Sequence, residues 1–150
     1  MDKTYITWDT FQKDCNITAV QINQPIDYII ALSRGGVVPA RIMAETIKPK
    51  HFLILGLKLY DGYTSGKDVH ITQDLDASEF DRHDKILIID DISDKGTTLQ
   101  FAISHVFRKS GGAHITTACP YIKTGTSRRP SYYSREFPDN EWVVFPFEKD

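Results

Sequence analysis

The sequence predicts an α/β fold: a mainly parallel, twisted sheet flanked by helices, with a small cap formed by the chain ends. Short runs of branched apolar residues alternate along the chain with segments whose apolar residues recur at helical spacing. Such alternation gives right-handed crossovers and therefore parallel strands. The 150 residues, 41% of them apolar and 25% charged, are typical of one domain spanning residues 1–150.

The first half of the chain contains two predicted helices and two predicted strands. Thr7 is suited to cap a first helix, one face of which would carry Trp8, Phe11, Cys15 and Ala19. Residues 27–32 predict a buried strand, and a helix is expected from about Val38, with a proline in its first turn. Lys48 and the proline after it end that helix. Residues 52–60 predict the second strand.

The second half begins with a polar stretch, residues 61–84, which predicts a long hairpin or a mobile loop. Residues 85–89 predict a third strand, and residues 98–109 a helix that ends at a pair of glycines. Residues 114–122 predict one further strand. The tail, residues 141–147, is expected to form a short strand and a cap over the sheet edge.

The composition excludes several classes of protein. A formal charge of −2 gives no sign of a nucleic-acid or membrane-surface partner, and no apolar run approaches the ~20 residues that span a bilayer. The N-terminus lacks the apolar core of a signal peptide. Cys15 and Cys119 are isolated, so we expect reduced, partly buried thiols rather than a disulfide or a zinc site. The five histidines lack metal-ligand spacing. We therefore expect a cytoplasmic protein.

A motif of acidic, glycine and threonine residues follows the third predicted strand. The backbone N–H groups at a helix start bind phosphate, and Gly96 allows the chain to approach such a group closely. The hydroxyls of Thr97 and Thr98 can donate further hydrogen bonds. Asp90 and Asp91 would be repelled by the same phosphate, so they should face sugar hydroxyls or a Mg²⁺ ion. The motif therefore predicts a phosphorylated sugar as ligand.

The turn after the first predicted strand has the same placement between a strand and a helix. Its residues are Ser33, Arg34, Gly35 and Gly36. The two glycines let consecutive N–H groups converge on an anion, and the planar Arg34 side chain suits a pair of phosphate oxygens. Taken alone, the pattern also fits an ordinary tight turn with a solvated arginine. Together the two turns predict sites for the two anionic ends of one molecule, on one rim of the sheet.

The acidic segment resembles the phosphoribosyl-diphosphate binding motif of the type I phosphoribosyltransferases: an apolar strand, two aspartates, two residues, Asp94, then glycine and threonine. The turn at residues 33–36 has the form found in the xanthine-guanine, or 6-oxopurine, phosphoribosyltransferases. This resemblance extends over nearly the whole chain. It implies the type I fold and purine salvage, in which guanine, xanthine or hypoxanthine receives ribose 5-phosphate from phosphoribosyl diphosphate and diphosphate is released. It also implies Mg²⁺ as cofactor and a homodimer or homotetramer.

The resemblance assigns the sugar and phosphate contacts. The loop of Lys95, Gly96, Thr97 and Thr98 would bind the 5-phosphate, and the turn at residues 33–36 the diphosphate. Asp91 would contact the metal, and Asp90 the ribose hydroxyls. Residues 61–76 resemble the family's mobile loop, in which Lys67 would contact the diphosphate. Lys95 and Thr97 depart from the usual pattern, so the loop geometry is expected to differ slightly.

The resemblance also assigns the purine contacts. Asp94 would lie near the purine N7 and take or stabilise its proton, which makes it the candidate catalytic residue. Lys123 would donate to the 6-oxo group, because an ammonium is only a donor. Trp142 would stack on the base, and the Val143 carbonyl would accept from a 2-amino group.

Other functions remain open from the sequence. The residues from Asp94 to Thr98 faintly resemble the nucleophile motif of phosphate-transferring hydrolases, but that aspartate directly ends its strand. A receiver domain carries its acidic pair on the first strand. A nucleotide-sensing regulator without turnover, or a transferase for adenine or a pyrimidine, would keep the same fold. Arg128 and Arg129 fit either an interface or an anion site.

Overall fold

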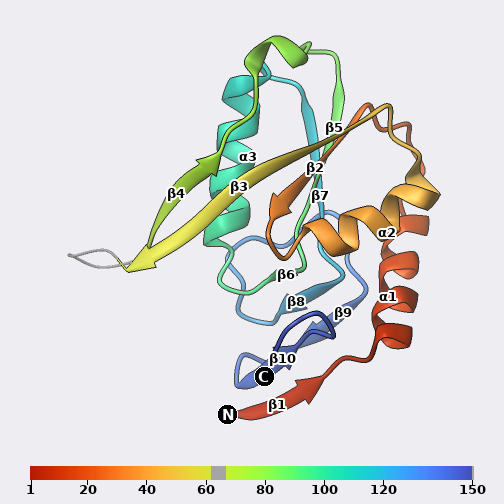
Figure 1. Ribbon diagram of the computed structural model, residues 1–150, viewed down its shortest axis with the longest axis vertical. Coiled ribbons are helices and arrows are strands. Elements are labelled where there is room, and N and C mark those ends of the chain that lie inside the picture. Colours follow the sequence, from red (N-terminus) through yellow and green to blue (C-terminus); the bar gives the residue numbers. More distant parts are fainter. Residues whose placement is uncertain (62–66, 150) are drawn as a thin grey trace.

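The computed structural model describes residues 1–61 and 67–149, with the side chains of Asp61 and Lys67 left out of the description. Its centre is a five-stranded sheet in the order β4-β3-β2-β5-β7, parallel except for β4 (Figure 1). The strands are β2 (Tyr28–Ser33), β3 (His51–Asp61), β4 (Lys67–Gln73), β5 (Lys85–Ile89) and β7 (His114–Ala118). The predicted α/β class and mainly parallel sheet are confirmed.

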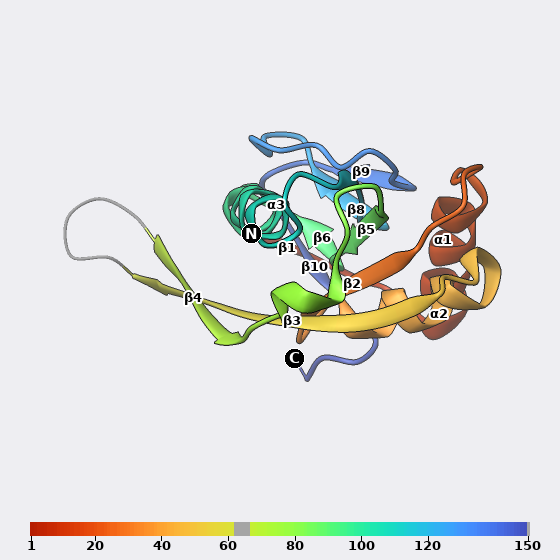
Figure 2. The same ribbon diagram turned by 90° about the horizontal axis from the view of Figure 1, so that it is seen from above.

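Helices cover both faces of this sheet (Figures 1 and 2). They are α1 (Trp8–Val20), α2 (Val37–Ile47) and α3 (Thr97–Lys109), and a short 3-10 turn, η1 (Ala77–Glu79), follows β4. Because side chains alternate along a strand, Ile29 and Ile30 of β2 enter different cores. Ile29 packs in the core with α1 and α2, and Ile30 in the core with α3. The two cores fix the positions of the strand ends and helix starts at the rim.

The predicted cap and buried face of the first helix are largely confirmed. The Thr7 side chain accepts a hydrogen bond from the Thr10 N–H at 3.2 Å, which caps α1. Phe11 and Cys15 are fully buried, whereas Trp8 is 53% exposed and meets the Phe11 ring edge-on. Both cysteines are free, and both are more deeply buried than expected.

The prediction of one strand over residues 114–122 is wrong. β7 ends at Ala118, and β8 (Tyr121–Lys123) belongs to a different, three-stranded parallel sheet with β6 (Ile92–Ser93) and β9 (Arg135–Phe137). Pro120 has no N–H to continue the ladder, and the Cys119 N–H bonds instead to the Tyr132 carbonyl. The apolar run therefore crosses from one sheet to another.

The chain ends form the expected cap. β10 (Glu141–Val144) pairs in parallel with β1 (Asp2–Tyr5), so the predicted tail strand stops at Val144. Phe145 and Phe147 continue past it and pack edge-on against Phe11 of α1. Aromatic contacts therefore hold the tail against the main core.

The polar stretch after the second strand is partly a hairpin. β3 and β4 pair antiparallel and extend away from the body of the molecule (Figure 2). Residues 62–66 of the predicted loop, and the side chain of Lys67, lie outside the described residues. Across residues 1–61 and 67–149, no helix combines the length and the apolar character needed to cross a membrane.

Candidate active site

The two turns singled out in the sequence lie side by side on one rim of the main sheet. They follow β2 and β5, which are neighbours, with Ala31 paired to Ile89. A Cβ atom added at Gly36 would lie 2.5 Å from the Ile89 carbonyl, and one added at Gly35 would lie 2.1 Å from the Asp91 carboxylate. Both positions therefore need glycine, because the turns are in direct contact. The peptide bond between Ser33 and Arg34 is cis.

The acidic pair sits where these turns meet. The Asp91 N–H donates to Asp90 Oδ1 at 2.8 Å, and the Ile92 N–H donates to Asp91 Oδ1 at 2.7 Å. Burial, with the neighbouring Asp91 charge, raises the pKa of Asp90 well above its usual value. Burial also raises the pKa of Asp91, to about 6, although hydrogen bonds oppose the rise. Two crowded carboxylates thus face the rim, where a bound cation would favour their charged forms.

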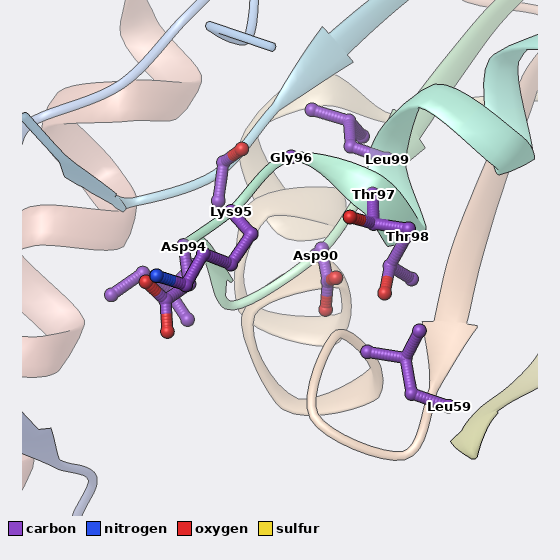
Figure 3. Close-up of a pocket in the computed structure, with 10 residues that line it drawn as sticks. Leu59, Asp90, Asp94, Lys95, Gly96, Thr97, Thr98 and Leu99 are labelled. Atoms are coloured by element: carbon purple, nitrogen blue, oxygen red, sulfur yellow. The ribbon is translucent and has the colours of Figure 1, made fainter. Parts of the chain in front are cut away.

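A first hollow, the α3 pocket, opens at the start of α3 (Figure 3). The Asp90 carboxylate and the Thr98 side chain point toward the same space, which Leu59 of β3 borders from the other side. Gly96 precedes the helix with φ 92°, a left-handed backbone that glycine adopts readily, and the first N–H groups of a helix have no partner within it. The lining residues are Leu59, Asp90, Ile92, Ser93, Asp94, Lys95, Gly96, Thr97, Thr98 and Leu99.

The loop at this pocket is braced from outside by residues 126–128. A Cβ added at Gly96 would lie 2.6 Å from both the Arg128 N and the Ser127 Oγ. Ser127 donates to the Lys95 carbonyl from its N–H at 2.9 Å and from its hydroxyl at 2.7 Å. Of the two arginines left open by the sequence, Arg129 is in an ion pair with Glu136 at 2.9 Å. Arg128 contributes its backbone to the brace.

A second hollow, the β8–β10 pocket, brings together the candidate base contacts. Lys123, Trp142 and Val143 line it with Asp91, Ile92, Asp94, Phe145 and Glu148. The Lys123 side chain is buried, and its ammonium donates to the Glu141 carbonyl and, at 3.5 Å, to the Pro138 carbonyl. Trp142 is 50% exposed, so one part of its ring is free to cover a ligand.

A third hollow, the Arg34 pocket, adjoins the second. It is lined by Arg34, Gly35, Val38, Asp91, Phe147, Glu148 and Lys149. Asp91 and Glu148 belong to both the second and the third hollow. Asp94 and Ile92 belong to both the first and the second. The three hollows thus form one continuous row along the rim.

Sequence reasoning missed several residues of this row. Leu59 comes from the predicted second strand, and its position at the rim follows only from the length of β3. Phe145 and Glu148 lie near the end of the chain, where no spacing signal points toward the acidic turn. Lys67 cannot be compared, since its side chain lies outside the described residues.

A buried polar network behind Lys123 was also missed. Asp14 of α1 accepts from the Tyr121 hydroxyl at 2.6 Å and from Arg135 Nε at 3.0 Å. Burial, together with the Asp14 hydrogen bond, raises the pKa of Tyr121. The network joins α1 to β8 and β9 and so fixes the strand that carries Lys123. An aspartate on the buried face of a predicted helix is the signal that could have found it.

The comparisons with known proteins agree with this geometry. The family model "Phosphoribosyl transferase domain" matches residues 4–150. Xanthine phosphoribosyltransferase 1 of Saccharomyces cerevisiae is 33% identical over 70% of this chain, and the chain spans only 60% of that curated relative's length.

Two solved structures share the fold. The purine phosphoribosyltransferase of Pyrococcus horikoshii superposes with a TM-score of 0.85 at 29% identity, covering 100% of this chain and 97% of that one. The xanthine-guanine-hypoxanthine phosphoribosyltransferase of Helicobacter pylori has a TM-score of 0.77 at 18% identity, covering 95% and 92%. On these grounds, the chain belongs to the phosphoribosyltransferase family.

Proposed function

We propose that the protein is a purine-salvage phosphoribosyltransferase that joins a 6-oxopurine to the ribose 5-phosphate of phosphoribosyl diphosphate and releases diphosphate. The observation that carries this proposal is the continuous row of three hollows, with Asp91 and Asp94 at the two junctions. A phosphorylated sugar with anions at both ends and a base at its anomeric carbon fits such a row. The named relatives support purines as the acceptors.

The sugar phosphate is assigned to the α3 pocket and the turn at residues 33–36. The 5-phosphate would accept hydrogen bonds from the N–H groups of Lys95 to Thr98 and from the threonine hydroxyls, at the positive end of α3. Asp90 would accept from the ribose hydroxyls. Arg34, with the backbone around Gly35, would hold the diphosphate, and Lys67 is proposed as a further contact.

The purine is assigned to the β8–β10 pocket. The Lys123 ammonium donates to the Pro138 and Glu141 carbonyls, and its third hydrogen would serve a 6-oxo group. Trp142 would stack on the ring. The Ile6 N–H donates to the Val144 carbonyl at 2.9 Å. Because successive carbonyls of a strand face opposite edges, the Val143 carbonyl faces away from β1 and is available to the base.

The donor set at Asp91 fits Mg²⁺. Carboxylate oxygens are the protein ligands that this ion prefers, and Asp91 would hold it beside the diphosphate. Within residues 1–61 and 67–149, no three potential ligand side chains cluster. The ion would therefore complete its shell with substrate oxygens and water, as Mg²⁺ commonly does beside phosphates. When bound, it neutralises charge on the departing diphosphate.

The chain's own residues would then act on a reaction that resembles glycoside cleavage. The bond between the anomeric carbon and the diphosphate oxygen breaks with its electron pair on oxygen, while a purine nitrogen attacks the same carbon. Holding both reactants in line lowers the barrier, and Arg34 stabilises the leaving group. Asp94, at the junction of the sugar and base hollows, would accept or stabilise the proton at N7.

The test is to incubate the protein with phosphoribosyl diphosphate, Mg²⁺ and each purine, with and without a chelator, and to follow nucleotide formation. We expect product with 6-oxopurines, none with adenine, and loss of product with the chelator. Product with adenine alone would refute the role of Lys123. Tight nucleotide binding without product from any base would instead indicate a regulator.

A second measurement concerns Asp94. The Asp94→Asn variant should lower kcat by about 100-fold while its affinity for phosphoribosyl diphosphate changes much less. Equal losses in turnover and affinity would show that Asp94 only binds. The expected cytoplasmic location and homodimeric or homotetrameric assembly belong to the same proposal, and cell fractionation and sedimentation test them.

A further inference from the structure

The brace, residues 126–128, holds one peptide group of the loop at the α3 pocket. The Lys95 carbonyl accepts two hydrogen bonds from Ser127, one from its N–H at 2.9 Å and one from its hydroxyl at 2.7 Å. The peptide bond between Lys95 and Gly96 is trans. In a trans peptide the C=O and the N–H point in opposite directions. The Gly96 N–H therefore points away from Ser127.

The side of the loop away from Ser127 is the pocket side. Lys95 and Gly96 line the α3 pocket, whereas the brace, which is described in full, does not. The loop thus lies between the brace and the hollow. Within residues 1–61 and 67–149, no protein acceptor takes the Gly96 N–H. The fold leaves this donor free, on the side where the proposed function places the 5-phosphate.

The backbone preference of Gly96 alone does not hold this orientation. Reversal of the 95–96 peptide group would carry the φ of Gly96 from 92° to the negative region, which glycine accepts as readily. The reversed peptide would turn the Lys95 carbonyl oxygen toward the phosphate, where the two negative groups repel each other. The hydrogen bonds to the Lys95 carbonyl therefore select the orientation that suits an anion.

Ser127 is itself held in place by Ser93. The Ser93 side chain is buried, and its hydroxyl donates to the Arg128 carbonyl at 2.8 Å and lies 2.9 Å from the Thr126 hydroxyl. The Thr126 hydroxyl also accepts from the Arg128 N–H at 3.3 Å. These bonds fix the residues on both sides of Ser127, so that its two donors stay directed to the Lys95 carbonyl.

We propose that Ser127 is a positioning residue for the 5-phosphate. By holding the Lys95 carbonyl it keeps the Gly96 N–H directed into the α3 pocket before the ligand arrives, and a donor oriented in advance costs no ordering on binding. Ser127 acts through the peptide group and not by touching the ligand. This role rests on the proposed function, which places the 5-phosphate in that pocket.

The size of the effect follows from the contact. Ser127→Ala removes the hydroxyl donor and keeps the N–H donor, and the lost hydrogen bond is exposed. We therefore expect the KM for phosphoribosyl diphosphate to rise about three- to tenfold, the effect of one hydrogen bond. The 5-phosphate is remote from the bond that breaks, so kcat should change far less.

The first experiment measures kcat and the KM values for phosphoribosyl diphosphate and guanine, at saturating Mg²⁺, in the wild type, Ser127→Ala and Ser131→Ala. Ser131 is the matched control, because it lies in the same connection between β8 and β9. Its hydroxyl accepts from the Thr117 N–H of β7 at 3.1 Å and not from the phosphate loop. Ser131→Ala should keep both KM values within about twofold of the wild type, and Ser127→Ala should keep that for guanine.

The second experiment observes the Gly96 N–H directly, by NMR of the ¹⁵N-labelled protein. Addition of ribose 5-phosphate to the wild type should move the Gly96 amide hydrogen signal downfield, because it then donates to an anion. At saturation the shift should be smaller in Ser127→Ala, where part of the molecules carry the reversed peptide, and unchanged in Ser131→Ala. A general loss of stability would not alter this signal.

Each outcome decides the matter. An unchanged KM for phosphoribosyl diphosphate in Ser127→Ala enzyme with wild-type circular dichroism overturns the inference while the proposed function stands. An equal rise in Ser131→Ala, or a Gly96 signal that stays in place when ribose 5-phosphate saturates the wild type, also overturns it. If the wild type neither binds ribose 5-phosphate nor forms nucleotide from any purine, the proposed function and this inference both fall.

Discussion

The α3 pocket and the β8–β10 pocket are built in different ways. Apart from Leu59, the α3 pocket is lined by Asp90 and residues 92–99, all from the segment between the end of β5 and the first turn of α3. The β8–β10 pocket combines that segment with the last residue of β8 and with a tail that must first pair with β1. The first pocket depends on local backbone conformation, and the second on the placement of the chain ends. Substitutions in each pocket should therefore show separately the effect of local backbone conformation and the effect of chain-end placement.

The largest effect is expected from Gly96→Ala in the α3 pocket. The new Cβ would lie 2.6 Å from Arg128 N and Ser127 Oγ, and the Gly96 backbone is left-handed at φ 92°. A loop displaced by about 1 Å costs roughly 100-fold in activity. We expect kcat/KM for phosphoribosyl diphosphate to fall by at least that factor, measured by initial rates.

Gly111→Ala is the matched control for this variant. Gly111 is also left-handed, at φ 69°, but among the described residues no atom outside its chain neighbours lies within 4 Å of the added Cβ. Gly111→Ala should lower the free energy of unfolding by about 1–2 kcal/mol, the cost of alanine in a left-handed backbone. Denaturant unfolding measures this loss, and activity should stay nearly normal. Similar losses of activity in both variants would show that backbone strain, and not the contact with residues 126–128, controls the loop.

A smaller effect, spread over binding and stability, is expected from Lys123→Met in the β8–β10 pocket. The change removes the proposed donor to the base and leaves the Glu141 and Pro138 carbonyls without its ammonium. The KM for guanine should rise roughly tenfold or more, and the free energy of unfolding should fall by about 1–3 kcal/mol. The KM for phosphoribosyl diphosphate should change far less.

Trp142→Ala provides the comparison for Lys123→Met. Its half-exposed ring should contribute stacking worth about 1–3 kcal/mol to base binding but little to folding. Purine affinity should therefore fall in both variants, while stability falls only in Lys123→Met. Equal stability of the two variants would contradict the view that Lys123 anchors the tail.

The same contrast explains what the sequence could predict. The acidic turn and the Gly35-Gly36 turn are contiguous motifs, so their position at the strand ends followed from apolar periodicity alone. The break between β7 and β8 did not, because residues 114–122 stay apolar while the chain changes sheets through its bond to Tyr132. Glu148 and the Asp14 network depend on contacts between segments far apart in sequence, which no local pattern records. Local patterns thus reached the α3 pocket, whereas Lys123, Trp142 and Val143 of the β8–β10 pocket were assigned only through the family resemblance.

The smallest effect concerns how α3 itself is held. Asp74, just after β4, accepts from the Leu75 N–H at 2.7 Å and contacts His105 Nε2 at 2.7 Å and Lys109 Nζ at 3.3 Å, both on α3. The His105 hydrogen bond is the main cause that lowers the pKa of Asp74 to about 2. These contacts lie at the far end of the helix from the α3 pocket. We therefore expect them to affect stability rather than catalysis.

The sign of the pH effect follows from the lowered pKa. The folded state favours the charged carboxylate, so its contribution is fully present above the unfolded pKa, near 4. It is lost as the pH falls toward 2. Because the side chain is 41% exposed, solvent screening limits the contribution to about 1 kcal/mol or less.

The Asp74→Asn variant should therefore be less stable than the wild type at pH 6, measured by urea unfolding, and the difference should shrink as the pH falls to 2. A difference that stays constant or grows over that range would mean that Asp74 holds α3 by packing and not by charge. Turnover at neutral pH should stay within about twofold of the wild type, since this anchor acts on the helix and not on the loop that Gly96 shapes.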